Sequence, residues 1–232
     1  MISIDLPEPT SRRMELVPEP RQVMGEALSI VEVNSWVELT DPQHIRLSNN
    51  PVYEDKELEQ FLASNDGTYR YDYVRLGCSF YPQKGERFEK AWLKVELKSE
   101  LTSEQLRWAP ISWSIFPLNE FDNVEETTSA KISGGKILNA EVGASSKFNR
   151  KLYSVRGYRE GKPNPFWALY NNEATTLNGS LRFHMVARSA GASPTLGEVR
   201  LEAVISNRSF VVFREKRPFD QTPSAEFRLP PA

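Results

Sequence analysis

Apolar and polar residues alternate with a period of two through much of this chain, and this alternation constrains the fold more than any other feature. Successive side chains of a β-strand point to opposite faces, so the pattern predicts strands with one buried face. It is strongest in five segments: 28–39, 70–80, 91–98, 177–188 and 198–206. Weaker strand patterns occupy 111–118, 128–133, 136–143, 150–158 and 210–214.

Helical periodicity is scarce, with one helix predicted over 55–63 and a single turn over 102–106. A parallel sheet needs crossover helices, and the sequence offers none between its strand segments. We therefore predict an all-β fold: an antiparallel β-sandwich or partly open barrel of roughly nine or ten strands with one or two short helices. Gly134-Gly135 and Asn178-Gly179 are predicted hairpin turns, because glycine tolerates positive φ.

Prolines gather at both ends of the chain, at 7, 9, 18 and 20 and again at 218, 223, 230 and 231. Proline fixes φ and lacks the backbone N–H that a sheet requires. Residues 1–26 and 215–232 are therefore predicted to be Pro-rich arms outside the core. The single sandwich domain is expected to span 27–214, a length that fits one β domain.

The charge balance excludes a strongly basic nucleic-acid binder, because 29 Lys and Arg face 31 Asp and Glu. A single cysteine, Cys78, rules out an intramolecular disulfide. The N-terminus lacks the basic and apolar regions of a secretory signal, and no apolar run is long enough to span a bilayer. From these features we expect a soluble, cytoplasmic protein with no membrane span.

Catalytic motifs are missing from the sequence. Cys78 shares its parity with the apolar positions of 70–80, so its thiol is expected to be buried and inert. His184 falls on the opposite parity from the apolar stripe of its strand, beside arginines that disfavour its charged form, and His44 lies in a turn-like run. No nucleophile elbow, phosphate-binding loop or zinc-ligand spacing occurs, so we expect no cofactor and no metal. The sequence therefore favours a non-enzymatic protein over an enzyme.

One run, 147–162, carries six basic residues and one acid, a local charge of +5. Aromatic residues interleave with them, a mixture that binds single-stranded nucleic acid or an acidic surface. The predicted anion-binding residues are Lys147, Arg150, Lys151, Arg156, Arg159 and Lys162. A solvated edge strand with protective charges explains the same run.

Aromatic residues also stand out, at Trp108, Trp113, Phe116 and Phe121. Strict alternation over 111–118 puts Trp113 on one face with two isoleucines and Phe116 on the other, which predicts a central strand or one covered by a partner. Further along, a loop predicted at 161–167 contains two prolines that restrict its backbone, and it ends in two aromatic residues. A third aromatic residue follows at position 170. The candidate partner-binding residues are Phe166, Trp167 and Tyr170, which serve equally as anchors or as plugs of the sandwich end.

Three functions follow from these features. The leading one is a non-catalytic binding or scaffold module that docks another protein, or a second copy of itself, through the loop aromatics and the Pro-rich arms. The first alternative is an anion-binding β module for single-stranded nucleic acid or a charged ligand, using 147–162. The second is a hydrolase with dispersed carboxylates, for which the acidic candidates are Glu54, Asp55, Glu125 and Glu126.

Overall fold

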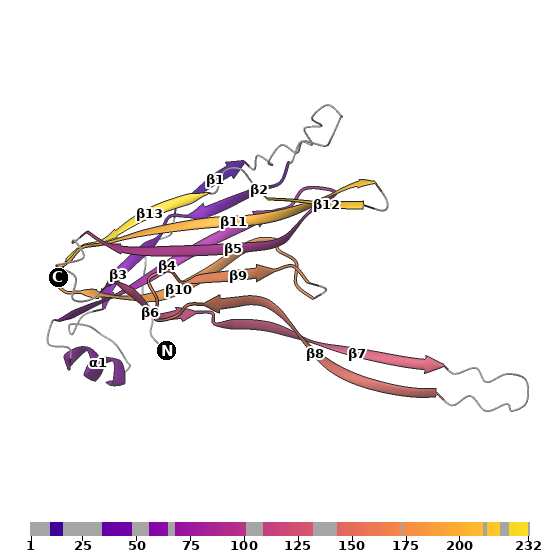
Figure 1. The fold of residues 1–232 in the computed structure, drawn as a ribbon, viewed down its shortest axis with the longest axis horizontal. Helices are drawn as coiled ribbons and strands as arrows, with labels where there is room; N and C mark the ends of the chain where they lie inside the picture. The colour runs from indigo at the N-terminus through magenta and orange to yellow at the C-terminus, as the bar shows by residue number, and fades with distance from the viewer. Residues whose placement is uncertain are drawn as a thin grey trace, which may run out of the picture.

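Two antiparallel β-sheets pack face to face in the computed structural model, which describes residues 10–15, 34–47, 56–64, 68–100, 109–131, 143–172, 174–210, 213–218 and 223–231 (Figure 1). Sheet 1 has the order β1-β2-β4-β10-β6, with β3 also paired to β4. Its strands are β1 (Ser11–Glu15), β2 (Trp36–Thr40), β3 (Gln43–Leu47), β4 (Tyr69–Tyr81), β6 (Ile111–Phe116) and β10 (Gly179–Ala190). The one helix among the described residues is α1 (Lys56–Ala63).

Sheet 2 has the order β12-β11-β5-β9-β8-β7, with β13 also paired to β11. Its strands are β5 (Glu86–Ser99), β7 (Asn119–Lys131), β8 (Gly143–Tyr158), β9 (Phe166–Tyr170), β11 (Thr195–Phe210), β12 (Phe213–Pro218) and β13 (Ser224–Leu229). β7 and β8 run together well beyond the ends of the other strands (Figure 1).

The core lies between the two inner faces, where alternation predicted it. Sheet 1 contributes Val74, Leu76, Cys78 and Phe80 from β4, and sheet 2 contributes Leu93, Val95 and Leu97 from β5. Burial of alternate side chains from both sheets is what stabilises a sandwich. The predicted all-β antiparallel sandwich is confirmed, and the two sheets are separate, so the open-barrel alternative does not apply.

Both predicted arms contain strands. β1 pairs with β2, and β13 pairs with the first six residues of β11. Ala225, Phe227 and Leu229 are buried in the core, so the prediction that 215–232 lies outside the core is wrong. Prolines at 223 and 230 flank β13 rather than interrupt it, where their missing N–H costs no ladder hydrogen bond.

The two predicted turns differ in outcome. β7 pairs with β8 as an antiparallel hairpin, as expected, although Gly134-Gly135 itself lies outside the described residues. Gly179 adopts a φ of +82°, but it is the first residue of β10 and pairs with Phe80 of β4. The predicted hairpin at Asn178-Gly179 is wrong, because β10 pairs with β4 and β6 and not with the strand before it.

A β-bulge decides which way Trp113 points. In the pairing of β10 with β6, Val186 lies opposite Ser114 while Ala187 lies opposite Ser112, so Trp113 is the extra residue. A bulge shifts the alternation by one position. Trp113 and Ser114 are both exposed as a result, and the predicted shared face of Trp113 and Ile115 is wrong.

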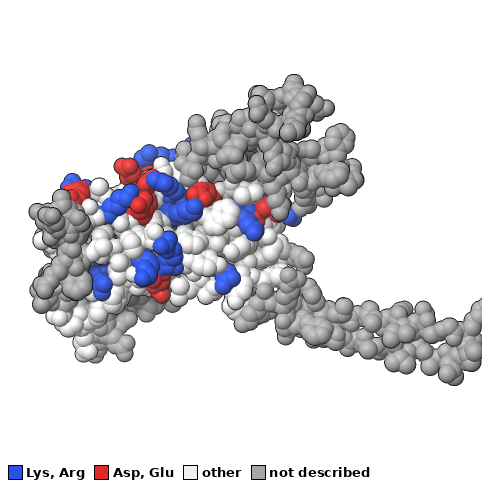
Figure 2. Space-filling view, viewed as in Figure 1, with Lys and Arg blue, Asp and Glu red and all other residues white. Residues whose placement is uncertain are grey.

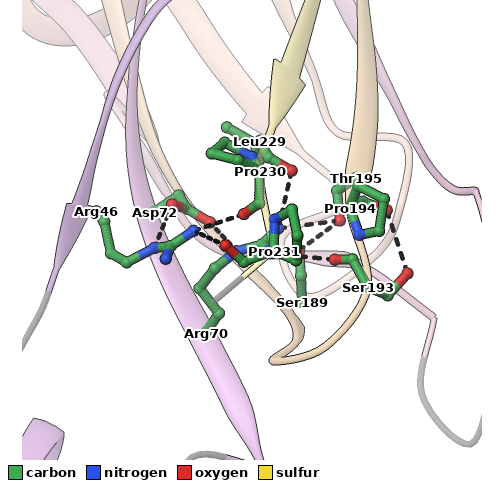
Figure 3. Close-up of polar contacts among 10 residues, drawn as sticks. All are labelled: Arg46, Arg70, Asp72, Ser189, Ser193, Pro194, Thr195, Leu229, Pro230 and Pro231. Atoms are coloured by element: carbon green, nitrogen blue, oxygen red, sulfur yellow. Dashed lines mark hydrogen bonds and ion pairs between the residues drawn. The ribbon is translucent and has the colours of Figure 1, made fainter.

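A buried ion pair closes one end of the sandwich (Figure 3). Arg70 Nε donates to Asp72 Oδ2 at 2.6 Å, and the two side chains are 2% and 1% exposed. The rest of the Arg70 guanidinium donates to the carbonyl oxygens of Ser193 and Leu229. Arg46 adds a hydrogen bond of 2.9 Å to the carbonyl of Pro231. β4 thereby holds the end of β13 against the turn between β10 and β11.

Candidate binding surfaces

Large apolar side chains lie exposed on the outer face of sheet 1, next to α1. Phe116 is 63% exposed and Trp113 is 43% exposed, values far above those of core aromatics. Phe61 and Ile45 are also exposed. Solitary exposed apolar residues are ordinary, whereas a contiguous group marks an interaction surface. We call these four residues the apolar band.

Ring contacts join the members of the band. The Phe61 ring, on α1, lies 6.0 Å from Trp113 and 5.2 Å from Tyr71. At the other end Phe116 lies 6.3 Å from His184, which stacks at 5.6 Å on Tyr73. Ile45 of β3 lies directly opposite Tyr73 of β4 in the pairing of these two strands. The band is therefore one surface that crosses four strands of sheet 1.

Arginines border the band. The guanidinium of Arg188 lies 4.8 Å from the centres of both the Tyr69 and the Trp113 rings, an arrangement typical of cation–π contacts. Arg75 and Arg182 lie near His184, whose pKa is lowered by burial first and then by these two positive charges. His184 also shares a hydrogen bond of 2.6 Å between Nδ1 and the Tyr73 hydroxyl. Of the two arginines expected beside His184, Arg182 lies near it, whereas Arg188 packs on Tyr69 and Trp113.

The backbone edge beneath the band is already occupied. Gly161 N donates to Ser112 O and Ser112 N donates to Lys162 O, so the loop after β8 pairs with β6. Glu160 Oε1 accepts from Ile115 N at 3.0 Å. Strand addition at these positions of β6 is therefore blocked, and any docking here uses the side chains of the band.

A groove of about 690 Å³ lies on the opposite side of the molecule, over the outer face of sheet 2. Its floor and one wall come from the outward-facing residues of two paired strands: Trp92, Lys94 and Glu96 of β5 and Glu198, Arg200 and Glu202 of β11. Figure 2 views this side of the molecule and shows basic and acidic side chains interleaved over these strands. Its volume falls within the range of about 300–1,000 Å³ typical of small-ligand sites.

The other wall is the loop between β8 and β9. Pro163 O and Pro165 O accept hydrogen bonds from Leu97 N and Val95 N, so the loop continues the pairing of β9 with β5. Arg159 has a φ of +63°, a left-handed conformation that a residue with a Cβ rarely adopts. Ser112 Oγ donates to Lys162 O at 2.9 Å and helps to hold this turn. The wall is therefore fixed in place.

The predicted partner-binding residues separate in the structure. All three lie on strand β9 rather than on a loop. Trp167 faces the core with an exposed fraction of 0%, and its Nε1 donates to Pro117 O at 2.9 Å. The prediction of a loop-borne docking role for Trp167 is wrong, because alternation along β9 turns it inward. Phe166 and Tyr170 face outward and are half-buried, and their role in binding stays a prediction.

The predicted anion-binding residues fall into two groups. Lys147, Arg150 and Lys151 lie on β8 at positions whose side chains are outside the described residues. Their strand is paired with β7, and the register sets 122–126, which contains three acids, beside 148–152.

The second group is exposed. Arg156 lies over the Tyr153 ring at 4.7 Å. Arg159 lines the groove on sheet 2, and Lys162 belongs to the same loop between β8 and β9. Binding of anions by any of the six residues stays a prediction.

The remaining chemical candidates show no catalytic arrangement among the described residues. Cys78 is buried, and burial raises the pKa of its thiol, as its parity predicted. His44 lies exposed on β3 rather than in a turn. Glu54 and Asp55, together with the side chains of Glu125 and Glu126, are outside the described residues. No group of three or more potential metal ligands occurs in the part of the chain that is described.

No protein-family model matches the chain, and no curated protein is similar enough to match. Among solved structures, one described as "Pore forming protein" aligns with a TM-score of 0.33 and 9% identity over 95% of this chain and 90% of its own. The delta-toxin of Clostridium perfringens aligns with a TM-score of 0.29 and 11% identity over 89% and 94%. Nothing about activity is transferred from similarity this low.

These neighbours conflict with the description of the chain as a cytoplasmic scaffold, which the sequence suggested. The prediction of a cytoplasmic scaffold was therefore wrong. Among the described residues, no helix is long and apolar enough to cross a bilayer. The sequence had no signal for either surface described above beyond isolated aromatics, because their members come from strands far apart in the chain.

Proposed function

We propose that the protein is a non-catalytic binding module whose docking surface is the apolar band, and that the band lies against a lipid surface. The observation that carries this proposal is the exposed apolar surface formed by Trp113 and Phe116 of β6, Ile45 of β3 and Phe61 of the adjoining helix α1. Such a patch is costly in water and marks a site of contact.

The chemistry around the band favours lipid as the occupant. Tryptophan and tyrosine rings with polar edges concentrate at the boundary between lipid headgroups and acyl chains. Arg188 packs its guanidinium on two of these rings, and Arg75 and Arg182 lie beside them, where they complement anionic headgroups. Burying the 63% of Phe116 or the 43% of Trp113 that is exposed contributes about 2–4 kcal/mol each as an upper bound, at about 25 cal/mol per Å² and total aromatic areas of about 150–250 Å².

Flotation with vesicles tests this proposal. The wild-type protein should float with phosphatidylcholine vesicles and more strongly when phosphatidylserine is added. The double variant Trp113→Ser, Phe116→Ser should remain unbound. Leu196→Ser is the matched control, because Leu196 is 43% exposed like Trp113 but lies on β11 of sheet 2.

Two results would contradict the proposal. One is equal flotation of the double variant and the Leu196→Ser control. The other is a wild-type protein that ignores vesicles but forms a dimer or binds another protein in solution through the band. That second result would restore the protein-docking function predicted from the sequence and move it from β9 to the band.

A further inference from the structure

The groove on sheet 2 is independent of the apolar band and holds a different chemistry. We propose that it binds an uncharged carbohydrate, with the sugar rings lying on Trp92 and Phe166 and the hydroxyl groups bonded to the charged side chains between them. Three properties of the groove support this: its balanced charge, its aromatic surfaces and the rigidity of its wall.

Charges in the groove cancel. Its lining carries three basic residues, at 94, 159 and 200, and three acidic residues, at 96, 198 and 202. Lys94 Nζ lies 2.5 Å from Glu202 Oε1. Arg200 donates to both carboxylate oxygens of Glu198, at 2.6 and 2.7 Å. A nucleic acid or other polyanion is attracted by a net positive field, which these residues do not provide.

Paired charges still present hydrogen-bonding groups. Each carboxylate keeps free lone pairs and each ammonium or guanidinium keeps free N–H donors after its partner is bound. The hydrogen bond from Arg200 lowers the pKa of Glu198, so this residue remains an ionised acceptor at neutral pH. Hydroxyl groups both donate and accept, and a neutral polyhydroxylated ligand therefore satisfies the groove without leaving a charge unmatched.

The aromatic residues supply the apolar part of the site. Trp92 and Phe166 occupy neighbouring positions of β5 and β9, where Trp92 lies opposite Ala168 and Phe166 lies opposite Lys94. Phe166 is held by stacking on Tyr158 at 4.8 Å with an angle of 13° between the rings. The C–H face of a sugar ring is apolar and packs on such rings, whereas its edge carries the hydroxyl groups. Pockets that combine apolar surfaces with a few fixed polar groups are typical ligand sites.

The wall of the groove is already set for a ligand. Arg159 keeps its left-handed backbone, and non-glycine residues in this conformation concentrate at ligand sites. Asn164 lines the same wall. Fixed walls lower the entropy cost of binding.

Binding of defined oligosaccharides tests the site. The probes are neutral hexasaccharides of glucose, mannose, xylose and N-acetylglucosamine, together with an immobilised array of neutral glycans. A sulfated hexasaccharide and a short single-stranded DNA are the charged comparisons. At least one neutral glycan should bind saturably and quench tryptophan fluorescence. Its affinity should change less than about twofold between low and high salt, because a neutral ligand releases no counterions.

Variants locate the binding. Trp92→Ala and Phe166→Ala should each weaken it by about tenfold or more. Arg159→Gly should weaken it while keeping the fold, since glycine accepts the positive φ without strain. The double variant Trp113→Ser, Phe116→Ser should bind the glycan like wild type, so loss of vesicle binding and loss of glycan binding are separable.

Three results would overturn the inference: no saturable binding to any neutral glycan, binding that Trp92→Ala and Arg159→Gly leave unchanged, or binding confined to the charged probes with steep salt dependence. The last would identify the groove as an anion site instead.

Discussion

Replacing Asp72 with asparagine should show how strongly the end of the sandwich depends on its buried ion pair. The Asp72→Asn substitution keeps the volume of the side chain and one acceptor oxygen but removes the negative charge. Arg70 would then be a buried cation with an exposed fraction of 2% and no counterion in hydrogen-bond contact. Arg46, 3.7 Å from Asp72, would lose the same partner.

The expected loss is large because water cannot compensate. Removing one partner of a buried pair costs about 3–5 kcal/mol. For a chain of this size each kcal/mol corresponds to roughly 2–4 °C in Tm, so Asp72→Asn should lower Tm by roughly 6–20 °C. Calorimetry and urea unfolding at neutral pH measure this change. The double variant Arg70→Met, Asp72→Leu, which removes both charges, should recover much of the loss.

An exposed pair provides the control. Arg200 and Glu198 have the same 2.6 Å separation between Nε and the carboxylate oxygen, but their side chains are 51% and 26% exposed. Glu198→Gln should leave the Tm unchanged, because surface ion pairs contribute little. If Asp72→Asn and Glu198→Gln have equal effects, burial is not what makes the Arg70–Asp72 pair matter. If the double variant is as unstable as Asp72→Asn, the unpaired charge is not the cause either.

Three further results are expected. Trp167→Ala should cost about 3–5 kcal/mol in urea unfolding, because the ring is wholly buried; a variant as stable as Phe166→Ala would contradict this. Gly197→Ala should lower the free energy of unfolding by about 1–3 kcal/mol, because a Cβ there would overlap the Phe227 ring. If the amides of β13 keep their full protection from hydrogen exchange in this variant, the overlap does not destabilise the strand. His184 should titrate below 6.5 by NMR, since its pKa is lowered. The unfolded chain then binds this proton more readily than the folded one, so the free energy of unfolding is highest above pH 6.5 and falls as the pH drops below that value. The variant His184→Gln should reduce this dependence of stability on pH.

Strand content was predictable because alternation is a local property. The segments 70–80 and 91–98 carry it strongly, and they became β4 and β5, with the predicted residues in the core. β13 was predictable by the same rule, since Ala225, Phe227 and Leu229 alternate with polar residues. The prolines nearby misled the prediction, because flanking positions do not need the N–H that proline lacks.

Tertiary structure alone decided where the surfaces lie. The bulge at Trp113 arises from the pairing of β6 with β10, and no local pattern marks it. The groove joins β5, β11 and the loop before β9, whose residues meet only because β5 lies between β11 and β9 in sheet 2. The register of β7 and β8 likewise sets acids beside the basic run. Sequence determines each strand's buried face through its period of two, whereas neighbours across a sheet depend on pairings between distant segments.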